Sequence, residues 1–372
     1  MKQEWGLPMA QVERHGHGGD LWSAGEIFGV NPLDLLDFSA NINPLGPPDG
    51  LFARLAQALP DITRYPDPTC RTFRRKLSGH LGVAPEQLLI GNGAAECLQL
   101  AVTALAPRYV GLVYPSFSEY ESAARKAGCE IIPLYTSAEQ DFLPETDQLL
   151  ALIDRSDMVF LGYPNNPTGN HLPIAALLEA ARTCSSHKTY LCVDEAFIDF
   201  LPDGEALSLL SRLNEFPYLI VFRSLTKMYA IPGLRLGFAA ASESVIARMA
   251  EKQIPWSVNH LAQVAGEYLL EDKDFIVTSQ QFTAAQRESL AASLAQINGV
   301  RVFPSRTNYL LLRVGGVSSY DLQQRLAAHG MLIRNCSMYP GLEDGYVRVA
   351  VKGDAENRRL VNALAQALEG ER

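Results

Sequence analysis

Positive charge is scarce in this chain of 372 residues. It contains 32 lysine and arginine residues against 41 aspartate and glutamate residues, which gives a formal net charge of −9 at pH 7. A protein of this charge is a poor counterion for DNA, RNA or an anionic membrane surface. We therefore expect no nucleic-acid partner and no membrane partner, while a local basic pocket for one small anion stays compatible with the composition.

Cysteines are also few, and their spacing is not that of a metal site. They form no CxxC pair and have no metal-ligand spacing with histidine; they stand at positions 70, 97, 129, 184, 192 and 336. Clustered cysteines would be typical of a zinc site or of a disulfide framework. The sequence thus predicts free thiols in a reducing cytoplasm and no bound metal.

Long apolar runs are missing as well. No stretch of about 18 uninterrupted apolar residues occurs, so no membrane-spanning helix is expected. The beginning of the chain breaks every short apolar stretch with a charge, a glycine or a proline, which is unlike a signal peptide. What the chain does have is length and 47% apolar residues, enough for two domains or one large domain with an attachment.

Short apolar runs alternate with helical patterns through the first two thirds of the chain. Continuous apolar runs of this kind are typical of strands covered on both faces, and the alternation predicts a doubly wound α/β domain with a mostly parallel sheet. We expect strands at 87–90, 109–114, 158–163, 189–194, 218–223 and 235–241, and helices at 94–105 and 173–184.

The alternation of short apolar runs with helical patterns ends at about residue 260. A long helical region at 260–297 precedes short strands and two further helices, which predicts a smaller α+β domain. We expect a large domain over 46–260 and a second unit formed by 1–45 with 261–372. The N-terminal residues would then lie against the small domain or cover the cleft.

A glycine-rich turn, GNGAAE at 91–96, follows one expected strand and opens an expected helix. Its glycines allow close approach to the backbone, and the free amides of Ala94 and Ala95 at a helix N-terminus suit a phosphate. The turn is not a P-loop, and Glu96 stands where the dinucleotide-binding fingerprint requires its third glycine. An ordinary βα turn is the alternative interpretation.

Polar residues also follow two other expected strands. In YPNNPTG (163–169) the prolines hold the loop, so that Asn166 can present its amide at the carboxyl edge of the sheet; a plain loop is the alternative. In VDEAF (193–197) a carboxylate directly follows a buried strand, which costs several kcal/mol unless it has a partner. Asp194 is therefore either a structural cap or the partner of a cationic ring nitrogen.

The segment RSLTKMYAIPGLRLG (223–237) is the most informative. Lys227 is flanked by apolar residues just after a strand, and Arg235 follows in the same loop. A lysine held in a cleft near cations has a lowered pKa and can form a Schiff base. Ser224 and Arg235 could clamp a phosphate from the same loop. For this segment in isolation, an exposed surface lysine is the alternative.

Taken together, the motifs occur in the order found in the fold-type I pyridoxal-phosphate enzymes, with Phe117 of YPSFSEY between the glycine turn and Asn-Pro-Thr-Gly. Two segments, DFSANINPLGPP (37–48) and RYPDP (64–68), resemble the histidinol-phosphate aminotransferase branch of the class I/II aminotransferases. Within that branch the chain resembles the threonine-phosphate decarboxylases of cobalamin biosynthesis, in HGG (17–19), DEAFIDF (194–200), PWSVN (255–259), TNYLLLR (307–313) and YPGLEDGYVRVAVK (339–352).

This resemblance implies a large, mostly parallel seven-stranded sheet domain with a small α+β domain, and pyridoxal 5'-phosphate as the cofactor. Lys227 would form the Schiff base, and Asp194 would keep the pyridine nitrogen protonated. Tyr65 would reach the cofactor phosphate from the neighbouring subunit, which implies a homodimer with shared active sites. The residues that the resemblance assigns to the cofactor are Tyr65, Gly93, Ala94, Ala95, Phe117, Asn166, Asp194, Ser224, Lys227 and Arg235.

The resemblance assigns the substrate carboxylate and phosphate to His17, Asn41, Arg334 and Arg348. In YVRVAV, alternation along a strand places Arg348 on the face opposite to Val347 and Val349. From the residues alone, Arg348 could equally be a solvated arginine of a packed sheet, and His17 an ordinary loop residue.

By resemblance, the reaction is the decarboxylation of L-threonine O-3-phosphate to (R)-1-amino-2-propanol O-2-phosphate. Phe197 stands where the related aminotransferases usually carry a tyrosine, and a phenylalanine has no hydroxyl to donate to the cofactor. Histidinol-phosphate aminotransferase and serine-phosphate decarboxylase are the alternatives within the superfamily. A non-enzymatic regulator on the same fold and a nicotinamide dehydrogenase are alternatives from other classes.

Overall fold

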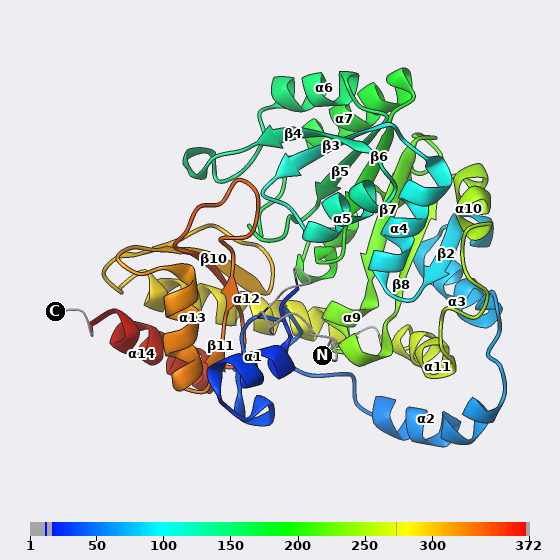
Figure 1. The fold of residues 1–372 in the computed structure, drawn as a ribbon. Coiled ribbons are helices and arrows are strands. Elements are labelled where there is room, and N and C mark those ends of the chain that lie inside the picture. The colour runs from blue at the N-terminus through cyan, green and yellow to red at the C-terminus, as the bar shows by residue number, and fades with distance from the viewer. Residues whose placement is uncertain (1–11, 13–16, 273, 370–372) are drawn as a thin grey trace, which may run out of the picture.

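The computed structural model describes residues 12, 17–272 and 274–369. Figure 1 shows a large sheet with helices on both faces, and beside it a smaller group of strands and helices that includes the C-terminal end of the chain. The blue N-terminal helix lies beside this smaller group, far along the chain from the elements that it neighbours.

The large sheet has seven strands in the order β2-β8-β7-β6-β5-β3-β4. β8 runs antiparallel to both of its neighbours, and the other neighbouring pairs are parallel. Its strands are β2 (Leu88–Gly91), β3 (Tyr109–Tyr114), β4 (Glu130–Tyr135), β5 (Met158–Gly162), β6 (Tyr190–Asp194), β7 (Leu219–Ser224) and β8 (Gly237–Ala241). The sheet is therefore mostly parallel, and the carboxyl ends of β3, β5, β6 and β7 meet at one edge.

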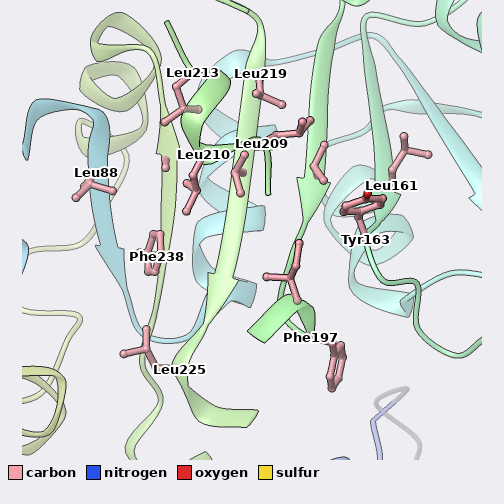
Figure 2. Close-up of a cluster of buried hydrophobic side chains, with 14 of the residues drawn as sticks. Leu88, Leu161, Tyr163, Phe197, Leu209, Leu210, Leu213, Leu219, Leu225 and Phe238 are labelled. Carbon is pink, nitrogen blue, oxygen red and sulfur yellow. The ribbon is translucent and has the colours of Figure 1, made fainter. Parts of the chain in front are cut away.

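Two apolar clusters cover the two faces of this sheet. On one face, buried side chains pack from α3 (Arg71–Leu81), α6 (Thr146–Asp154), α7 (Ile174–His187) and α11 (His260–Leu269). On the other face they come from α4 (Ala94–Leu105), α5 (Ser118–Lys126) and α10 (Glu243–Ala250). Figure 2 shows part of the first cluster, where Leu209, Leu210 and Leu213 lie against the sheet near Leu219.

The small domain is built on a four-stranded antiparallel sheet in the order β12-β13-β10-β9. Its strands are β9 (Val300–Val302), β10 (Tyr309–Val314), β12 (Arg334–Asn335) and β13 (Tyr346–Ala350). A third apolar cluster joins this sheet to α12 (Asp274–Leu294), α13 (Ser319–Ala328) and α14 (Asp354–Glu369).

The N-terminal segment belongs to the small domain by hydrogen bonding. β1 (Leu36–Asp37) pairs in parallel with β11 (Met331–Leu332), and α1 (Leu21–Phe28) contacts α13. The remaining helices are α2 (Leu51–Ala58), α8 (Gly204–Leu207) and α9 (Leu225–Met228). The described residues of the N-terminal segment thus contact β11 and α13, while residues 1–11 and 13–16 lie outside the described part of the chain.

The predicted fold class is confirmed, and each of the six predicted strands of the first two thirds is present with ends within two residues of those predicted. The edge strand β4 was not predicted, because it alternates between exposed and half-buried residues and contains Pro133 instead of a continuous apolar run. The expected helical region at 260–297 is divided into α11 and α12. The domain boundaries at 45/46 and 260/261 stay a prediction.

Within the described residues, no helix is long and apolar enough to cross a membrane. The same part of the chain contains no group of histidine, cysteine, aspartate and glutamate side chains arranged to hold a metal ion. All six cysteines are free of disulfide bonds, and five of them are buried.

We expect Leu360→Ala to lower the free energy of unfolding by about 2–5 kcal/mol, because Leu360 is fully buried between α14 and the small sheet and its truncation leaves a cavity. Urea unfolding followed by circular dichroism measures this change. Leu33→Ala is the matched control, since Leu33 is 79% exposed and its truncation should stay within about 0.5 kcal/mol of wild type. Equal effects of the two substitutions would contradict the position of this core.

Candidate active site

A cavity of about 570 Å³ lies at the carboxyl edge of the large sheet. Its walls come from three parts of the chain: the loops after the parallel strands, the N-terminal segment from His17 to Ile42, and Tyr339 and Arg348 of the small domain. Parallel strands end at a common edge, so residues distant in the sequence meet there. The cavity therefore combines side chains from both domains.

The start of α4 forms one end of the cavity. Gly93 has a φ of 83° and precedes the amides of Ala94 and Ala95, which as the first amides of a helix have no intrahelical acceptor. The guanidinium of Arg235 lies directly over Gly93, since a Cβ added to Gly93 would stand 2.6 Å from Nη2. A Cβ added to Gly237 would likewise stand 2.5 Å from the amide nitrogen of Ala94. The two glycines thus allow a close-packed set of donors suited to a phosphate.

Ser224 and Thr226 extend this set of donors. Both side chains are buried, both line the cavity, and their hydroxyl oxygens are 2.7 Å apart. One hydroxyl donates to the other, which leaves a hydroxyl proton of the pair for a further acceptor. The loop after β7 therefore adds a neutral hydroxyl donor to the cationic Arg235.

Lys227 lies in the middle of the cavity wall, on the short helix α9. Burial lowers the pKa of Lys227 to about 8, and the cations Arg348 and Arg235 act in the same direction. The carboxylates Asp37 and Asp194 oppose this shift. A large fraction of this amine is therefore neutral near pH 8, the form that attacks a carbonyl carbon.

Asn43 holds the lysine-bearing loop. Its backbone amide donates to the carbonyl oxygen of Lys227 at 3.0 Å, and its side-chain amide donates to the carbonyl of Met228 at 2.7 Å and to the hydroxyl of Ser279 at 2.8 Å. Asn43 is 3% exposed, so these hydrogen bonds are shielded from water.

Asp194 ends strand β6 and is held on both oxygens. Tyr120 donates its hydroxyl to Oδ2 at 2.8 Å, and the amide of Ala196 donates to Oδ1 at 3.0 Å. Burial raises the pKa of Asp194, and these two hydrogen bonds act against that rise. The carboxylate therefore reaches the cavity in a fixed orientation, ready to accept a proton-bearing ring nitrogen.

Arg348 links three segments of the chain. Its Nη1 donates to the side-chain oxygen of Asn166, its Nη2 donates to the carbonyl of Ser39 at 2.7 Å, and its guanidinium carbon lies 5.3 Å from the ring centre of Tyr309. The predicted orientation of Arg348, away from the core of the small domain, is confirmed because the side chain lines the cavity.

Two aromatic side chains give the cavity flat walls. Phe117 makes an edge-to-face contact with Tyr120, with ring centres 5.6 Å apart, and another with His17 at 5.3 Å. His17 also makes a 2.7 Å contact with the carboxylate of Glu119 at the exposed rim. Phe197 lines the cavity with its edge against Tyr309, at 4.9 Å between ring centres.

The structure gathers most of the predicted site residues in this one cavity. The predicted residues that line it are His17, Asn41, Ala94, Ala95, Phe117, Asn166, Asp194, Ser224, Lys227, Arg235 and Arg348. Gly93 lies under Arg235 and completes the turn.

Two predicted site residues lie elsewhere. Tyr65 is 84% exposed and lies against Trp256 outside the cavity of its own chain, with ring centres 5.0 Å apart and the rings tilted by 38°. Arg334 is buried, with its guanidinium carbon 5.4 Å from the ring centre of Tyr339; it is the register partner of Arg348 in the small sheet but does not itself line the cavity. The roles of Tyr65 and Arg334 stay predictions.

Sequence reasoning missed Asp37, Tyr120, Thr226 and Tyr339, which all line the cavity. A signal existed for Tyr120, because it follows Phe117 by three residues at the start of a helix and so shares its face. Thr226 lies within the lysine motif itself. Asp37 and Tyr339 begin two of the segments that carry the resemblance, at 37–48 and 339–352, but neither was given a role; pairing of β1 with β11 and the fold of the small domain bring them to the cavity.

The donor set of this cavity fits a ring compound that carries a phosphate. Among the described residues, the buried Oδ1 of Asn41 and Nε of Arg348 have no hydrogen-bond partner, although both side chains line the cavity. Such atoms are costly unless a ligand or water satisfies them. Pyridoxal phosphate matches the arrangement, because the glycine turn suits its phosphate, Lys227 its aldehyde, and Asp194 its ring nitrogen.

In the cofactor-free protein, we expect the rate of pyridoxal capture to rise with pH and to level off above a midpoint near pH 8. The reason is that the neutral amine of Lys227 reacts and its pKa is lowered to about 8. The rate is followed by the absorbance change of pyridoxal, with Lys227→Ala as the control that captures none in the cavity. Arg348→Met should move the midpoint upward, since it removes one of the nearby cations. A wild-type midpoint near 10.5 would contradict the lowered pKa.

We expect Gly237→Ala to weaken pyridoxal-phosphate binding by about tenfold or more, because the added methyl group collides with the amide of Ala94 and displaces a hydrogen-bond donor to a charged phosphate. Isothermal titration of the cofactor into cofactor-free protein measures the change. Gly233→Ala is the matched control in the same loop, since a Cβ there meets no atom within 4 Å. Unchanged affinity in Gly237→Ala would exclude this turn as the phosphate site.

Comparison with known proteins agrees with this geometry. Residues 34–364 match the family described as aminotransferase class I and II. The chain is 42% identical to threonine-phosphate decarboxylase of Salmonella typhimurium, over 95% of this chain and 97% of that protein. Among solved structures, histidinol-phosphate aminotransferase from Clostridium acetobutylicum is 28% identical with a TM-score of 0.85, over 91% of this chain and 100% of that one. L-threonine-O-3-phosphate decarboxylase from Porphyromonas gingivalis is 28% identical with a TM-score of 0.81, over 90% and 100%. The chain belongs to the aminotransferase class I and II family.

Proposed function

We propose that this protein is a pyridoxal-phosphate-dependent lyase that decarboxylates L-threonine O-3-phosphate to (R)-1-amino-2-propanol O-2-phosphate, for the linker of the cobalamin nucleotide loop. The observation that carries the proposal is the 42% identity, over nearly the whole length of both chains, to a threonine-phosphate decarboxylase. The cavity agrees with it, because cationic and hydrogen-bonding side chains gather there in a protein that is acidic overall.

The positions of the following residues around the cavity support the cofactor roles that we propose for them. Ala94, Ala95, Ser224 and Arg235 would hold the phosphate, Phe117 would stack on the ring, and Asn166 would donate to the phenolic oxygen; all six residues line the cavity. Asp194 would accept a hydrogen bond from the protonated ring nitrogen and so keep that nitrogen cationic. When bound, pyridoxal phosphate supplies a conjugated ring that accepts the electron pair released at the substrate's Cα.

Lys227 performs the proton transfers. Its neutral Nζ is the group that would hold the cofactor's aldehyde, and when it is not bound to the cofactor it is a buried base inside the cavity. Because its pKa is about 8, Nζ can both hold and release a proton near neutral pH. We assign to it the return of a proton to Cα once the carboxylate has left.

The substrate side of the cavity decides which bond breaks. The bond at Cα that stands perpendicular to the ring is the one whose electrons the ring accepts, so the cations that hold the carboxylate select the reaction. We propose that Arg334 and Arg348, with Asn41 and His17, bind the substrate carboxylate and phosphate. Phe197 presents an apolar edge in the same cavity and donates no hydrogen bond.

The second candidate, histidinol-phosphate aminotransferase, is favoured by the TM-score of 0.85 to such an enzyme. It uses the same cofactor residues and breaks the Cα–H bond instead. Serine phosphate is an alternative substrate, because one methyl group contributes only about 1–3 kcal/mol of discrimination.

We further propose a cytoplasmic homodimer with shared active sites. Six cysteines without disulfide bonds are typical of proteins in reducing compartments. Tyr65 and Trp256 form an exposed aromatic pair outside the cavity of their own chain, which supports delivery of Tyr65 to the cofactor phosphate of a second subunit.

The proposal predicts that the holoenzyme, given L-threonine O-3-phosphate alone, releases CO2 in equal amount to aminopropanol phosphate, as measured by a coupled CO2 assay and mass spectrometry. Lys227→Ala should lower this rate by about 10²–10⁴-fold, because the general acid and base is lost. Exposed Lys188→Ala is the control and should keep the wild-type rate.

Three outcomes of this experiment separate the candidates. Consumption of glutamate with imidazole-acetol phosphate, without release of CO2, would establish the aminotransferase and refute the decarboxylase. Equal turnover of serine phosphate would broaden the substrate assignment. A wild-type protein that stays colourless with pyridoxal phosphate would refute the cofactor assignment altogether.

A further inference from the structure

A buried ion-pair cluster lies immediately behind the active-site edge of the large sheet, and it takes no part in the chemistry described above. It consists of Arg223 on β7, Glu195 just after β6, and Asp199 and Ser208 in the loop that follows. Glu195 is fully buried and Arg223 is 8% exposed. Charged groups at such depth are rarely found without a reason, because desolvation costs several kcal/mol for each ion.

Each side-chain nitrogen of Arg223 and each carboxylate oxygen of Glu195 has a hydrogen-bond partner. Arg223 donates from Nε to Glu195 at 2.8 Å, from Nη1 to Asp199 at 2.6 Å and from Nη2 to the hydroxyl of Ser208 at 3.0 Å. Glu195 also accepts from the amide of Leu209 at 2.8 Å and from the Ser208 hydroxyl at 2.7 Å. The planar guanidinium thus spans three acceptors at once, which a lysine ammonium cannot do with the same geometry.

Strand alternation places this cluster one residue away from the cofactor residues. Glu195 follows Asp194, and Arg223 precedes Ser224, so the cluster faces the first apolar cluster while the cofactor residues face the opposite side. The amide of Glu195 donates to the carbonyl of Phe222 at 2.9 Å, which continues the pairing of β6 with β7. The side chains of Arg223 and Glu195 therefore connect the ends of the two strands beyond the last ladder bond.

A bound cofactor constrains these two strand ends strongly. Its ring nitrogen, aldehyde carbon and phosphate are at fixed covalent distances, and β6 supplies the carboxylate while the loop after β7 supplies the lysine and a phosphate donor. If the end of β6 shifted against the end of β7, the cofactor could keep its contact with Asp194 or its contacts with the loop after β7, but not both. Displacements of about 1 Å at a catalytic group are enough to cost about 100-fold in rate.

We propose that Arg223 is a positioning residue: its ion pair with Glu195 holds the end of β6 against the end of β7 and so fixes Asp194 relative to the lysine-bearing loop. The proposal rests on the proposed function, because it takes the cavity to hold pyridoxal phosphate. Its effect is mechanical and reaches the cofactor through the backbone, since neither side chain lines the cavity.

The test compares Arg223→Lys and Ser208→Ala with wild type, using cofactor-loaded protein. The first readout is the absorbance of the bound cofactor against pH, without substrate. Without its contact to Asp194, the ring nitrogen of the cofactor would lose its proton, and the ring would withdraw less electron density. The lysine nitrogen bound to the cofactor would then be more basic, so its pKa would rise. We therefore expect the midpoint of the absorbance change to move upward by about 0.5–1 pH unit in Arg223→Lys, and less in Ser208→Ala.

The second readout is the kinetics with L-threonine O-3-phosphate. We expect kcat to fall on the order of tenfold in Arg223→Lys, with KM changed less than about twofold, because the substrate-binding residues stay in place. Arg212→Lys is the matched control: Arg212 pairs with Glu215 at 2.9 Å on the exposed surface and should leave both readouts unchanged.

Wild-type values of both the absorbance midpoint and kcat, with only a lower melting temperature, would show a merely structural ion pair and overturn the proposal. If Arg223→Lys fails to fold, Ser208→Ala decides by the same criteria. A shifted midpoint in a protein that releases no CO2 would refute the proposed function and leave the positioning role standing.

Discussion

The buried carboxylate of Asp194 is the constraint on which the rest of the site depends. A carboxylate at the end of an apolar strand stays ionised only if donors surround it, and burial alone raises its pKa. Tyr120 from α5 and the amide of Ala196 meet that requirement from two sides. Tyr120 in turn stacks on Phe160 of β5 at 5.1 Å between ring centres, so packing of α5 on the sheet orients the hydroxyl that binds Asp194.

The buried amine of Lys227 has a different environment from the buried carboxylate of Asp194: the cations near it favour its neutral form. Lys227 has cations near it, and these lower its pKa together with burial. The positive charges of Arg235 and Arg348 thus have two effects: they attract anionic groups, and they keep the amine of Lys227 neutral and reactive. This explains how a chain with a net charge of −9 can form a cavity suited to anionic groups, because the relevant field is set by a few side chains within that cavity.

The site residues that lie within one short, continuous sequence motif could be predicted from the sequence. The glycine turn at 91–96 and the lysine segment at 223–237 lie where predicted because each motif folds within one strand end and one helix start. Tyr120 was missed because its partner is 74 residues away in the chain and only the sheet brings them together. The edge strand β4 was missed for a related reason: a strand covered on one side lacks the apolar run that reveals a central strand.

Arg348 shows how substrate recognition and the arrangement of the domains become one interaction. Two of its nitrogens already bind Asn166 of the large domain and Ser39 of the N-terminal segment, which leaves Nε without a partner among the described residues. An anionic substrate group that binds this guanidinium must either use Nε or replace one of the existing hydrogen bonds. Replacing one of them would loosen a contact that holds the two domains together, so the free energy of substrate binding is coupled to the position of the small domain. A substrate without a correctly placed anion could not replace a hydrogen bond of Arg348 with one of its own. Selectivity between substrates would then arise at the domain interface as well as at the cofactor.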